Sequence, residues 1–218
     1  MITKFPDPRS ADPETGILAS GGDLEPESLL LAYRQGIFPW PMKGFPLLWF
    51  CPTRRGILFF KKLHFPRSLE KFRRKSSYTF TTDKAFGEVI RHCAKAPRPG
   101  ERGTWITQPM IQAYTRLHEL GYAHSIETWA GDKLVGGIYG VSVDGIFAGE
   151  SMFHLKPNAS KLALLHLVDL LTHEGVKWMD IQMVTPHMAI LGAEEISRDD
   201  YLKLLGKTLR PRKMLLSL

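Results

Sequence analysis

The chain alternates between two kinds of hydrophobic spacing. Apolar side chains that recur every three or four positions predict five amphipathic helices. These helices cover residues 26–35, 68–75, 84–95, 108–120 and 159–174. Gly36, Gly121 and Gly175 follow three of them and are expected to end them, and Asn158 is expected to cap the last one.

The stretch between the last two helices has the spacing of strands instead. Residues 123–129, 134–143 and 146–153 are separated by two short turns, which predicts a three-stranded antiparallel meander. A further strand is predicted over residues 176–184, after the last helix. Helices, a meander, a helix and a strand in this order are typical of an acyltransferase domain of the GNAT type.

This order predicts a mixed α+β fold with two domains. A GNAT-like domain of residues 55–218 has a mainly antiparallel central sheet flanked by helices, and a small, turn-rich domain of residues 1–54 precedes it. GNAT-type acyltransferases bind the pyrophosphate of acyl-coenzyme A with a glycine-rich turn before the helix that follows the meander. The corresponding turn here, residues 154–160, has no glycine, so coenzyme A is not the expected donor.

The small domain contains two aromatic clusters framed by prolines. Trp49 and Phe50 are expected to form its core. Trp40 stands between two prolines, which hold the backbone extended and are expected to keep it outside a regular sheet. Trp40 is therefore the better candidate for an exposed surface on which another ring stacks.

The composition fits a soluble protein of the cytoplasm. With 218 residues, 44% of them hydrophobic, the chain can bury one good core and a smaller second one. No hydrophobic run approaches the roughly 18 residues needed to span a membrane, and the start has no signal-peptide pattern. Cys51 and Cys93 lie far apart, without the Cys and His spacing of a metal site, so neither a disulfide nor a metal is expected.

The positive charge of the chain is concentrated in one segment. The net charge is +7, and residues 54–102 contain 14 Lys and Arg against four Asp and Glu. Such a segment is either a solvated face or a binding surface for a polyanion such as a nucleic acid. Its densest part comprises Lys61, Lys62, Arg67, Lys71, Arg73, Arg74 and Lys75.

Two polar residues interrupt the apolar strand predicted over residues 176–184. In a regular strand, Trp178, Asp180 and Gln182 point to one face. Burial of a carboxylate and an amide costs free energy unless both are hydrogen-bonded. The pair is therefore either an internal tether or part of a substrate site, and at this point both interpretations stand.

Ten segments, spread in the right order over nearly the whole chain, resemble the leucyl/phenylalanyl-tRNA–protein transferase family. The matching segments are residues 21–24, 33–40, 103–107, 113–121, 123–127, 136–140, 149–153, 158–161, 180–182 and 191–193. The resemblance implies an enzyme that moves Leu, Phe or sometimes Met from aminoacyl-tRNA, such as Leu-tRNA or Phe-tRNA, to the N-terminal Arg or Lys of an acceptor protein. This addition marks the acceptor for degradation through the bacterial N-degron route. The resemblance also implies that tRNA replaces coenzyme A and that neither a metal nor another cofactor takes part.

By this resemblance, five residues surround the reacting groups. Trp40 and Trp105 engage the terminal adenosine of the tRNA, and Tyr114 lines the same site. The side-chain carbonyl of Gln182 accepts a hydrogen bond from the attacking amine, and Asp180 polarises or orients this side chain of Gln182. The basic segment holds the acceptor arm of the tRNA.

The resemblance also implies sites for the substrate side chains. Ile138, Phe147 and Leu167 map to an apolar pocket for the aminoacyl side chain. Glu150 is expected either to bind the cationic N-terminal residue of the acceptor or to hold the α-ammonium of the donor. Ser151 either adds a hydroxyl group or only packs.

Two other functions stay open on the sequence. One is an N-acetyltransferase that uses acetyl-coenzyme A, which the glycine-free turn disfavours. The other is a noncatalytic tRNA-binding module, which leaves Asp180 and Gln182 without a role. No catalytic role is expected for His118, His124 or His187. The chain ends in a basic tail from residue 210, shorter than in some relatives.

Overall fold

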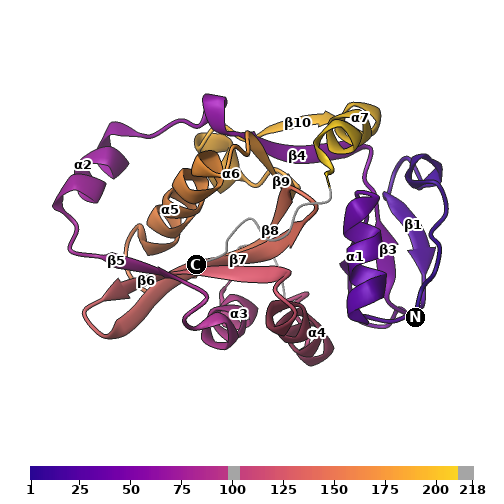
Figure 1. The fold of residues 1–218 in the computed structure, drawn as a ribbon, viewed down its shortest axis with the longest axis horizontal. Coiled ribbons are helices and arrows are strands. Elements are labelled where there is room, and N and C mark those ends of the chain that lie inside the picture. Colours follow the sequence, from indigo (N-terminus) through magenta and orange to yellow (C-terminus); the bar gives the residue numbers. More distant parts are fainter. Residues whose placement is uncertain (98–103, 211–218) are drawn as a thin grey trace.

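The computed structural model describes residues 1–97 and 104–210 of the chain (Figure 1). Within these residues the protein has two sheets and seven α-helices. The helices are α1 (Pro26–Arg34), α2 (Arg67–Lys75), α3 (Phe86–Lys95), α4 (Gln108–Glu119), α5 (Ala159–His173), α6 (Pro186–Ile190) and α7 (Arg198–Thr208). The strands are β1 (Ile17–Ser20), β2 (Phe38–Trp40), β3 (Leu48–Phe50), β4 (Arg54–Phe59), β5 (Thr79–Thr82), β6 (Ala123–Ala130), β7 (Lys133–Val143), β8 (Ile146–His154), β9 (Trp178–Gln182) and β10 (Glu194–Ser197).

A seven-stranded sheet forms the centre of the molecule. Its order is β10-β4-β9-β8-β7-β6-β5, and every neighbouring pair is antiparallel except β8 and β9. Helix α5 connects these two parallel strands, because a parallel pair needs a long crossover. The predicted fold class is confirmed: a small unit precedes a mixed α+β unit with a mainly antiparallel sheet. The exact boundary at residues 54 and 55 stays a prediction, although the large sheet begins there with β4.

Helices cover both faces of this sheet (Figure 1). Neighbouring side chains of β7 point to opposite faces, so Ile138 packs in a core cluster with residues of α5, whereas Tyr139 packs in a cluster with α3 and α4. The latter cluster continues into the small unit through Leu29 of α1 and Trp49 of β3. Buried hydrophobic contacts therefore join the small unit to the large sheet and hold α1 beside it.

The small sheet corrects the expectation for Trp40. Its order is β1-β3-β2, and Trp40 in β2 lies opposite Leu48 in β3. The prediction that the flanking prolines keep Trp40 outside a sheet was wrong. Because β2 is an edge strand, Pro39 can lack an N–H group without breaking the ladder. Trp49 is buried in the core, as predicted, and Phe50 packs against it half-buried.

The five predicted helices and the meander are all present, with ends that differ by at most two residues. The start of α5 differs in its chemistry. Asn158 occupies the N-cap position, as predicted, but it has a φ of 62° and its side chain makes no capping hydrogen bond. Gly136 lets this end of the helix lie directly on β7, because a Cβ atom there would be 2.5 Å from the Cβ of Ala159.

Several expectations concern features away from the sheet. Among the described residues, no helix is long and apolar enough to cross a membrane. Cys51 and Cys93 are both buried, and no disulfide joins them. The basic tail beyond residue 210 lies outside the described residues, as do residues 98–103, which include part of the basic segment and the start of the segment 103–107.

Candidate active site

A pocket of about 260 Å³ is lined by residues of β8 and β9, by Trp40 of the small unit and by Trp105, which precedes α4. Six predicted site residues line it: Trp40, Trp105, Ile138, Glu150, Ser151 and Gln182. Most of the other lining residues are apolar, and four of them are methionines: Met152, Met179, Met183 and Met188. These methionines were not predicted as site residues, because their spacing is that of ordinary core residues. Flexible thioether side chains suit a pocket that accommodates apolar groups of different shape.

A larger hollow, of about 560 Å³, lies beside Trp178 and Thr208. Lys61 of the basic segment lines it, but none of the residues predicted to act in catalysis or to bind the terminal adenosine or the aminoacyl side chain does. Its size alone therefore does not make it the candidate site, since chemistry needs convergent polar groups as well as space.

An irregularity in the sheet places Glu150 at the pocket. Tyr139 pairs with Ser151 and Gly140 pairs with Gly149, so Glu150 is an extra residue of β8 that has no partner in β7. Such a bulge turns a side chain out of the regular alternation of the strand, and bulges are frequent next to active sites. The sequence pattern of β8 does not reveal it.

A second irregularity places Gln182. The register of β4 and β9 shifts between the pairs Gly56–Gln182 and Ile57–Asp180, and Gln182 has a φ of 56°. A left-handed backbone costs a residue with a side chain about 1 to 2 kcal/mol. Gly56 makes this turn possible, because a Cβ atom there would lie 2.7 Å from the carbonyl carbon of Met183. Strain of this kind clusters at functional sites.

Asp180 does not line the pocket and instead forms a buried ion pair with Arg55. The guanidinium donates from Nε to Oδ1 at 2.8 Å and from Nη2 to Oδ2 at 2.6 Å, and both side chains are 1% exposed. The Tyr201 hydroxyl donates to Oδ2 at 2.9 Å, and the backbone N–H of Gln182 donates to Oδ1 at 2.9 Å. Asp180 thus fixes the backbone that carries Gln182.

Arg55 is the main residue of the site region that the sequence analysis missed. Its guanidinium lies between the rings of Phe38 and Tyr201, 4.6 Å and 4.5 Å from their centres. Burial lowers the pKa of Arg55, but the charge and hydrogen bonds of Asp180, together with Tyr201 and Cys51, outweigh it and raise that pKa above its ordinary value. Arg55 stands in the basic segment, where its charge has the same appearance in the sequence as that of its exposed neighbours.

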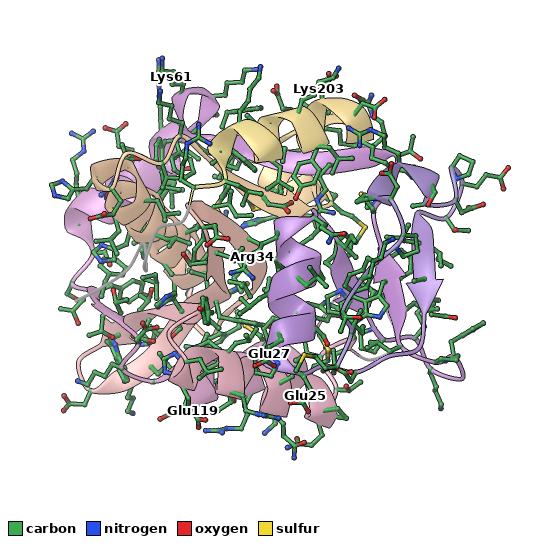
Figure 2. The ribbon with its side chains drawn as sticks, turned by 45° about the vertical axis from the view of Figure 1, so that its right-hand side comes forward. Glu25, Glu27, Arg34, Lys61, Glu119 and Lys203 are labelled. Atoms are coloured by element: carbon green, nitrogen blue, oxygen red, sulfur yellow. The ribbon has the colours of Figure 1, made fainter. Side chains whose placement is uncertain are left out.

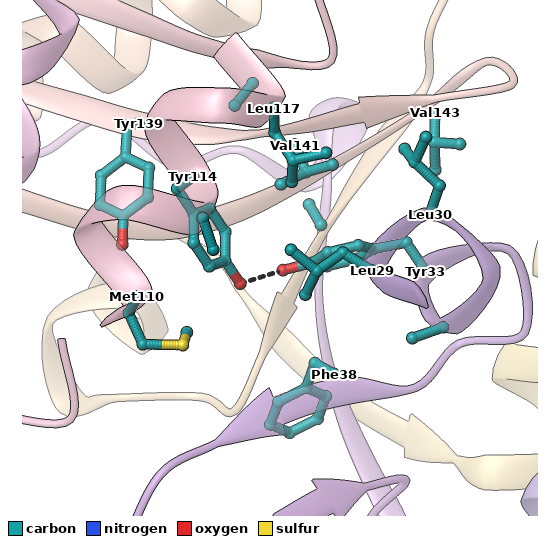
Figure 3. Packing of buried hydrophobic residues seen from close by; sticks show 14 of the residues in the cluster. Leu29, Leu30, Tyr33, Phe38, Met110, Tyr114, Leu117, Tyr139, Val141 and Val143 are labelled. Atoms are coloured by element: carbon teal, nitrogen blue, oxygen red, sulfur yellow. Dashed lines mark hydrogen bonds between the residues drawn. The ribbon is translucent and has the colours of Figure 1, made fainter. Parts of the chain in front are cut away.

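Glu150 is the centre of a hydrogen-bond network that reaches both units. The Tyr33 hydroxyl donates to Oε1 at 2.8 Å, the Tyr114 hydroxyl donates to Oε2 at 3.3 Å, and Nε2 of Gln182 donates to Oε1 at 2.9 Å. The hydroxyl groups of Tyr33 and Tyr114 are themselves 2.5 Å apart, across the contact of α1 with α4 (Figure 3). Burial raises the pKa of Glu150 to about 7, although the bonds from the two tyrosines oppose this shift.

The predicted aromatic residues fall into two positions. Trp40 and Trp105 stack on each other, with ring centres 5.1 Å apart and planes inclined by 23°, and both line the pocket. Tyr114 is fully buried behind Glu150 and is not part of the lining. The structure therefore brings the tryptophans together, and it places Tyr114 in the layer that supports the carboxylate.

Only one of the three residues predicted to form the apolar pocket lines it. Ile138 lines the pocket, whereas Phe147 and Leu167 lie within the core cluster that packs beneath α5. Leu164, one helical turn before Leu167, reaches the pocket instead. Helical spacing identified the right face of α5, but not the turn that meets the site.

The predicted basic residues all lie on exposed positions of a short 3-10 helix, Phe60–Lys62, and of α2. Three of them form ion pairs, Lys62 with Glu194, Arg73 with Asp169 and Arg74 with Glu70. Lys61, Arg67, Lys71 and Lys75 make no ion pair with any residue that the structure describes. Helix α2 has a single buried residue, Leu69, and stands at the edge of the fold away from α1 (Figure 1).

Acidic residues gather elsewhere on the surface. Figure 2 shows Glu25, Glu27 and Glu119 on the side of the molecule opposite Lys61. These glutamates and Lys61 of the basic segment therefore lie on different sides of the molecule. No group of three or more His, Cys, Asp or Glu side chains in the described part of the chain could hold a metal ion.

The site combines an apolar chamber, stacked rings, a carboxylate and an oriented amide. These groups can receive an apolar side chain, a base and an amine, which are the requirements of an acyltransferase whose donor is a nucleic acid. A family model described as leucyl/phenylalanyl-tRNA protein transferase matches residues 57–206, and the model of the N-terminal domain of the same family matches residues 22–53. The chain belongs to the leucyl/phenylalanyl-tRNA–protein transferase family.

Relatives with this name are similar over most of their length. The protein from Anaeromyxobacter sp. (strain K) is 51% identical over 94% of this chain and 88% of its own. The protein from Syntrophobacter fumaroxidans is 51% identical over 89% of this chain and 83% of its own. The protein from Nitratidesulfovibrio vulgaris (strain DP4) is 49% identical over 94% of this chain and 88% of its own.

Similar solved structures are far more distant in sequence. The structure of L-PGS from Bacillus licheniformis has 13% identity and a TM-score of 0.43, over 73% of this chain and 52% of that chain. The ribosomal-protein-alanine N-acetyltransferase from Brucella melitensis has 12% identity and a TM-score of 0.35, over 66% of this chain and 98% of that chain.

Proposed function

We propose that the pocket is the site at which Leu or Phe passes from aminoacyl-tRNA to the N-terminal Arg or Lys of an acceptor protein. The observation that carries this proposal is that Gln182 and Glu150 line the same pocket as the stacked pair Trp40 and Trp105. A group that can hold an amine thus lies beside rings that can hold the terminal base of the donor.

The donor would be held by its backbone and by its terminal base. The basic residues of α2 are suited to contact phosphates of the acceptor arm, which gives binding that weakens with salt. A terminal adenine can stack on Trp40 or Trp105, and such stacking contributes about 1 to 3 kcal/mol per base. The aminoacyl side chain would then enter the chamber of Ile138, Leu164 and the methionines.

The acceptor amine would be aligned by Gln182. Because Nε2 of Gln182 donates to Glu150, the side-chain carbonyl oxygen is left to accept a hydrogen bond from the amine. Asp180 supports this geometry from behind, through Arg55 and the backbone of Gln182. Placing an amine near an ester that is already activated accounts for much of the rate enhancement that such a reaction needs.

The reaction itself forms an amide bond from an ester. The amine nitrogen bonds to the carbonyl carbon, the bond from that carbon to the ribose oxygen breaks, and the ribose hydroxyl leaves. In a bacterial cell, the added Leu or Phe would mark the acceptor for degradation. A reporter protein that begins with Arg should then persist longer in cells that lack this enzyme.

The variant Gln182→Asn tests the role of the pocket. Asn tolerates a left-handed backbone well, but its side chain is shorter by one methylene and cannot hold the same position. We expect transfer to fall by about 10²-fold, as for a misplacement of about 1 Å, while the affinity for aminoacyl-tRNA stays within about twofold. Equal losses of transfer and affinity would show that Gln182 is a structural residue and that the pocket is not the reaction site.

A further inference from the structure

Transfer requires that the acceptor lose a proton before it can attack. An N-terminal amine has a pKa of about 7.7 to 8.0 and is mainly protonated at neutral pH, and an ammonium group is not a nucleophile. The protein must therefore offer a group that takes this proton close to the ester.

The structure leaves few candidates for that group. Asp180 accepts two hydrogen bonds from Arg55 and further ones from Tyr201 and the backbone of Gln182, and it is not part of the pocket lining. The amide of Gln182 is too weak a base to hold a proton. Among the described residues that line the pocket, Glu150 is the single carboxylate.

The surroundings of Glu150 have room for one more hydrogen atom. Glu150, Tyr33 and Tyr114 form a ring of three contacts between oxygen atoms. When Glu150 is ionised, the two tyrosine hydroxyl groups supply only two hydrogen atoms for these three contacts. A proton on Oε2 completes the ring, because Glu150 can then donate to Tyr114, Tyr114 to Tyr33, and Tyr33 back to Oε1.

We propose that Glu150 accepts the proton of the acceptor ammonium, and that Tyr33 and Tyr114 are positioning residues that hold the carboxyl group in both of its protonation states. The inference rests on the function proposed above and adds the proton acceptor to it. It also gives the small N-terminal unit a part in the reaction, because Tyr33 belongs to α1.

The step moves two protons, forms one C–N bond and breaks one C–O bond. One N–H proton passes from the ammonium to Glu150 and leaves a neutral amine. The nitrogen bonds to the ester carbon, a second N–H proton ends on the departing ribose oxygen, and the C–O bond breaks. Glu150 releases its proton to solvent before the next turnover.

The electrostatics of the site agree with this role. Burial raises the pKa of Glu150 to about 7, the charge of Asp180 raises it too, and Tyr33, Tyr114 and Arg55 lower it. A base whose pKa lies near the working pH is ionised before the reaction and still holds the proton once it has accepted it. Burial also raises the pKa of both tyrosines well above the ordinary value, so they remain neutral donors.

The pH dependence of Glu150→Gln tests the proposal. Transfer of radiolabelled Leu from Leu-tRNA to an Arg peptide is measured in single turnovers from about pH 6 to about pH 8.5, with ester hydrolysis subtracted. The wild-type rate should fall about tenfold per pH unit below pH 7. The variant lacks the base and depends on amine that is already neutral. The ratio of the wild-type rate to the variant rate should therefore be largest at pH 6 and roughly tenfold smaller at pH 8.5.

Tyr33→Phe tests the positioning role against a matched control, Tyr122→Phe, which removes a hydroxyl group from a partly buried tyrosine outside the network. Because the bond from Tyr33 lowers the pKa of Glu150, its loss should move the acidic limb of the rate profile to higher pH. The control should keep the wild-type profile.

Two results would overturn the inference. A ratio of wild-type to Glu150→Gln transfer rates that is the same at every pH would mean that Glu150 only shapes the pocket. A Tyr33→Phe profile that is lowered evenly, without a shift, would mean that Tyr33 only packs. Both results leave the proposed function intact, which fails separately if the wild-type protein transfers nothing at any pH.

Discussion

Replacement of Asp180 by Asn tests the interpretation that this residue acts through a buried ion pair. Arg55 and Asp180 are each 1% exposed and are joined by two hydrogen bonds. The change keeps the size of the side chain and removes its charge, so Arg55 stays buried without a counterion. Removal of one partner of a buried pair typically costs about 3 to 5 kcal/mol.

The expected loss is a large part of the stability of a domain, which is about 5 to 15 kcal/mol. With a urea dependence of about 2 to 3 kcal/mol per M, the midpoint of unfolding should fall by about 1 to 2.5 M. Tryptophan fluorescence and circular dichroism in urea measure this shift. Asp169→Asn is a matched control, because its pair with Arg73 is exposed and contributes about 0 to 1 kcal/mol.

A second variant separates charge from packing. Arg55→Met combined with Asp180→Leu replaces the pair by apolar side chains, which is often neutral for stability. It should recover at least half of the stability that Asp180→Asn loses, and yet transfer less, because the backbone of Gln182 has lost its acceptor. A stability of Asp180→Asn within about 1 kcal/mol of the wild type, together with lost transfer, would refute the reasoning and make Asp180 a directly acting group.

Three further changes test the donor site and the geometry of the pocket. Trp40→Ala should weaken aminoacyl-tRNA binding by about 1 to 3 kcal/mol in a filter-binding assay, whereas Phe45→Ala, at an exposed ring of the same unit, should not. Lys71→Ala should reduce the slope of log affinity against log salt by about 1, and Lys203→Ala on α7 should leave it unchanged. Gly56→Ala should lower single-turnover transfer by about 10²-fold with little change in tRNA affinity, because its Cβ would meet the backbone of Met183. Unchanged binding in Trp40→Ala would contradict the stacking role, and an unchanged salt slope in Lys71→Ala would contradict the phosphate contact. Unchanged transfer in Gly56→Ala would contradict the role of the turn at Gln182.

Periodicity was enough to predict four of the seven strands of the large sheet and five of the seven helices, whereas β4, β5 and α7 were not predicted. Apolar spacing located the meander and the helix α5, because those segments bury one continuous face. It gave no sign of the short strands β1 and β10 or of the short helix α6, which have four or five residues each. Elements of this length contain too few positions for a period to be distinguished.

The candidate residues were found by resemblance, and their arrangement was not. Glu150 reaches the pocket because of a bulge, and Gln182 because of a left-handed backbone opposite Gly56. Neither irregularity follows from the alternation of polar and apolar residues. In a regular strand Asp180 and Gln182 would share one environment, whereas in the structure only Gln182 meets the pocket.

Arg55 and Tyr33 illustrate a different limit. Each is buried by residues that are distant in the chain, Arg55 by Phe38 and Tyr201, and Tyr33 by contacts to Tyr114 and Glu150. Local pattern cannot separate a buried arginine from the exposed ones beside it. Such partners become visible only when the small unit is placed against the sheet.

Peptide aminoacylation without coenzyme A is the most direct test of the account. The purified protein is mixed with radiolabelled Leu-tRNA and with peptides that differ only in beginning with Arg, Lys or Ala. We expect label on the Arg and Lys peptides and none on the Ala peptide. Label on all three alike, on none, or only after addition of acetyl-coenzyme A would contradict it.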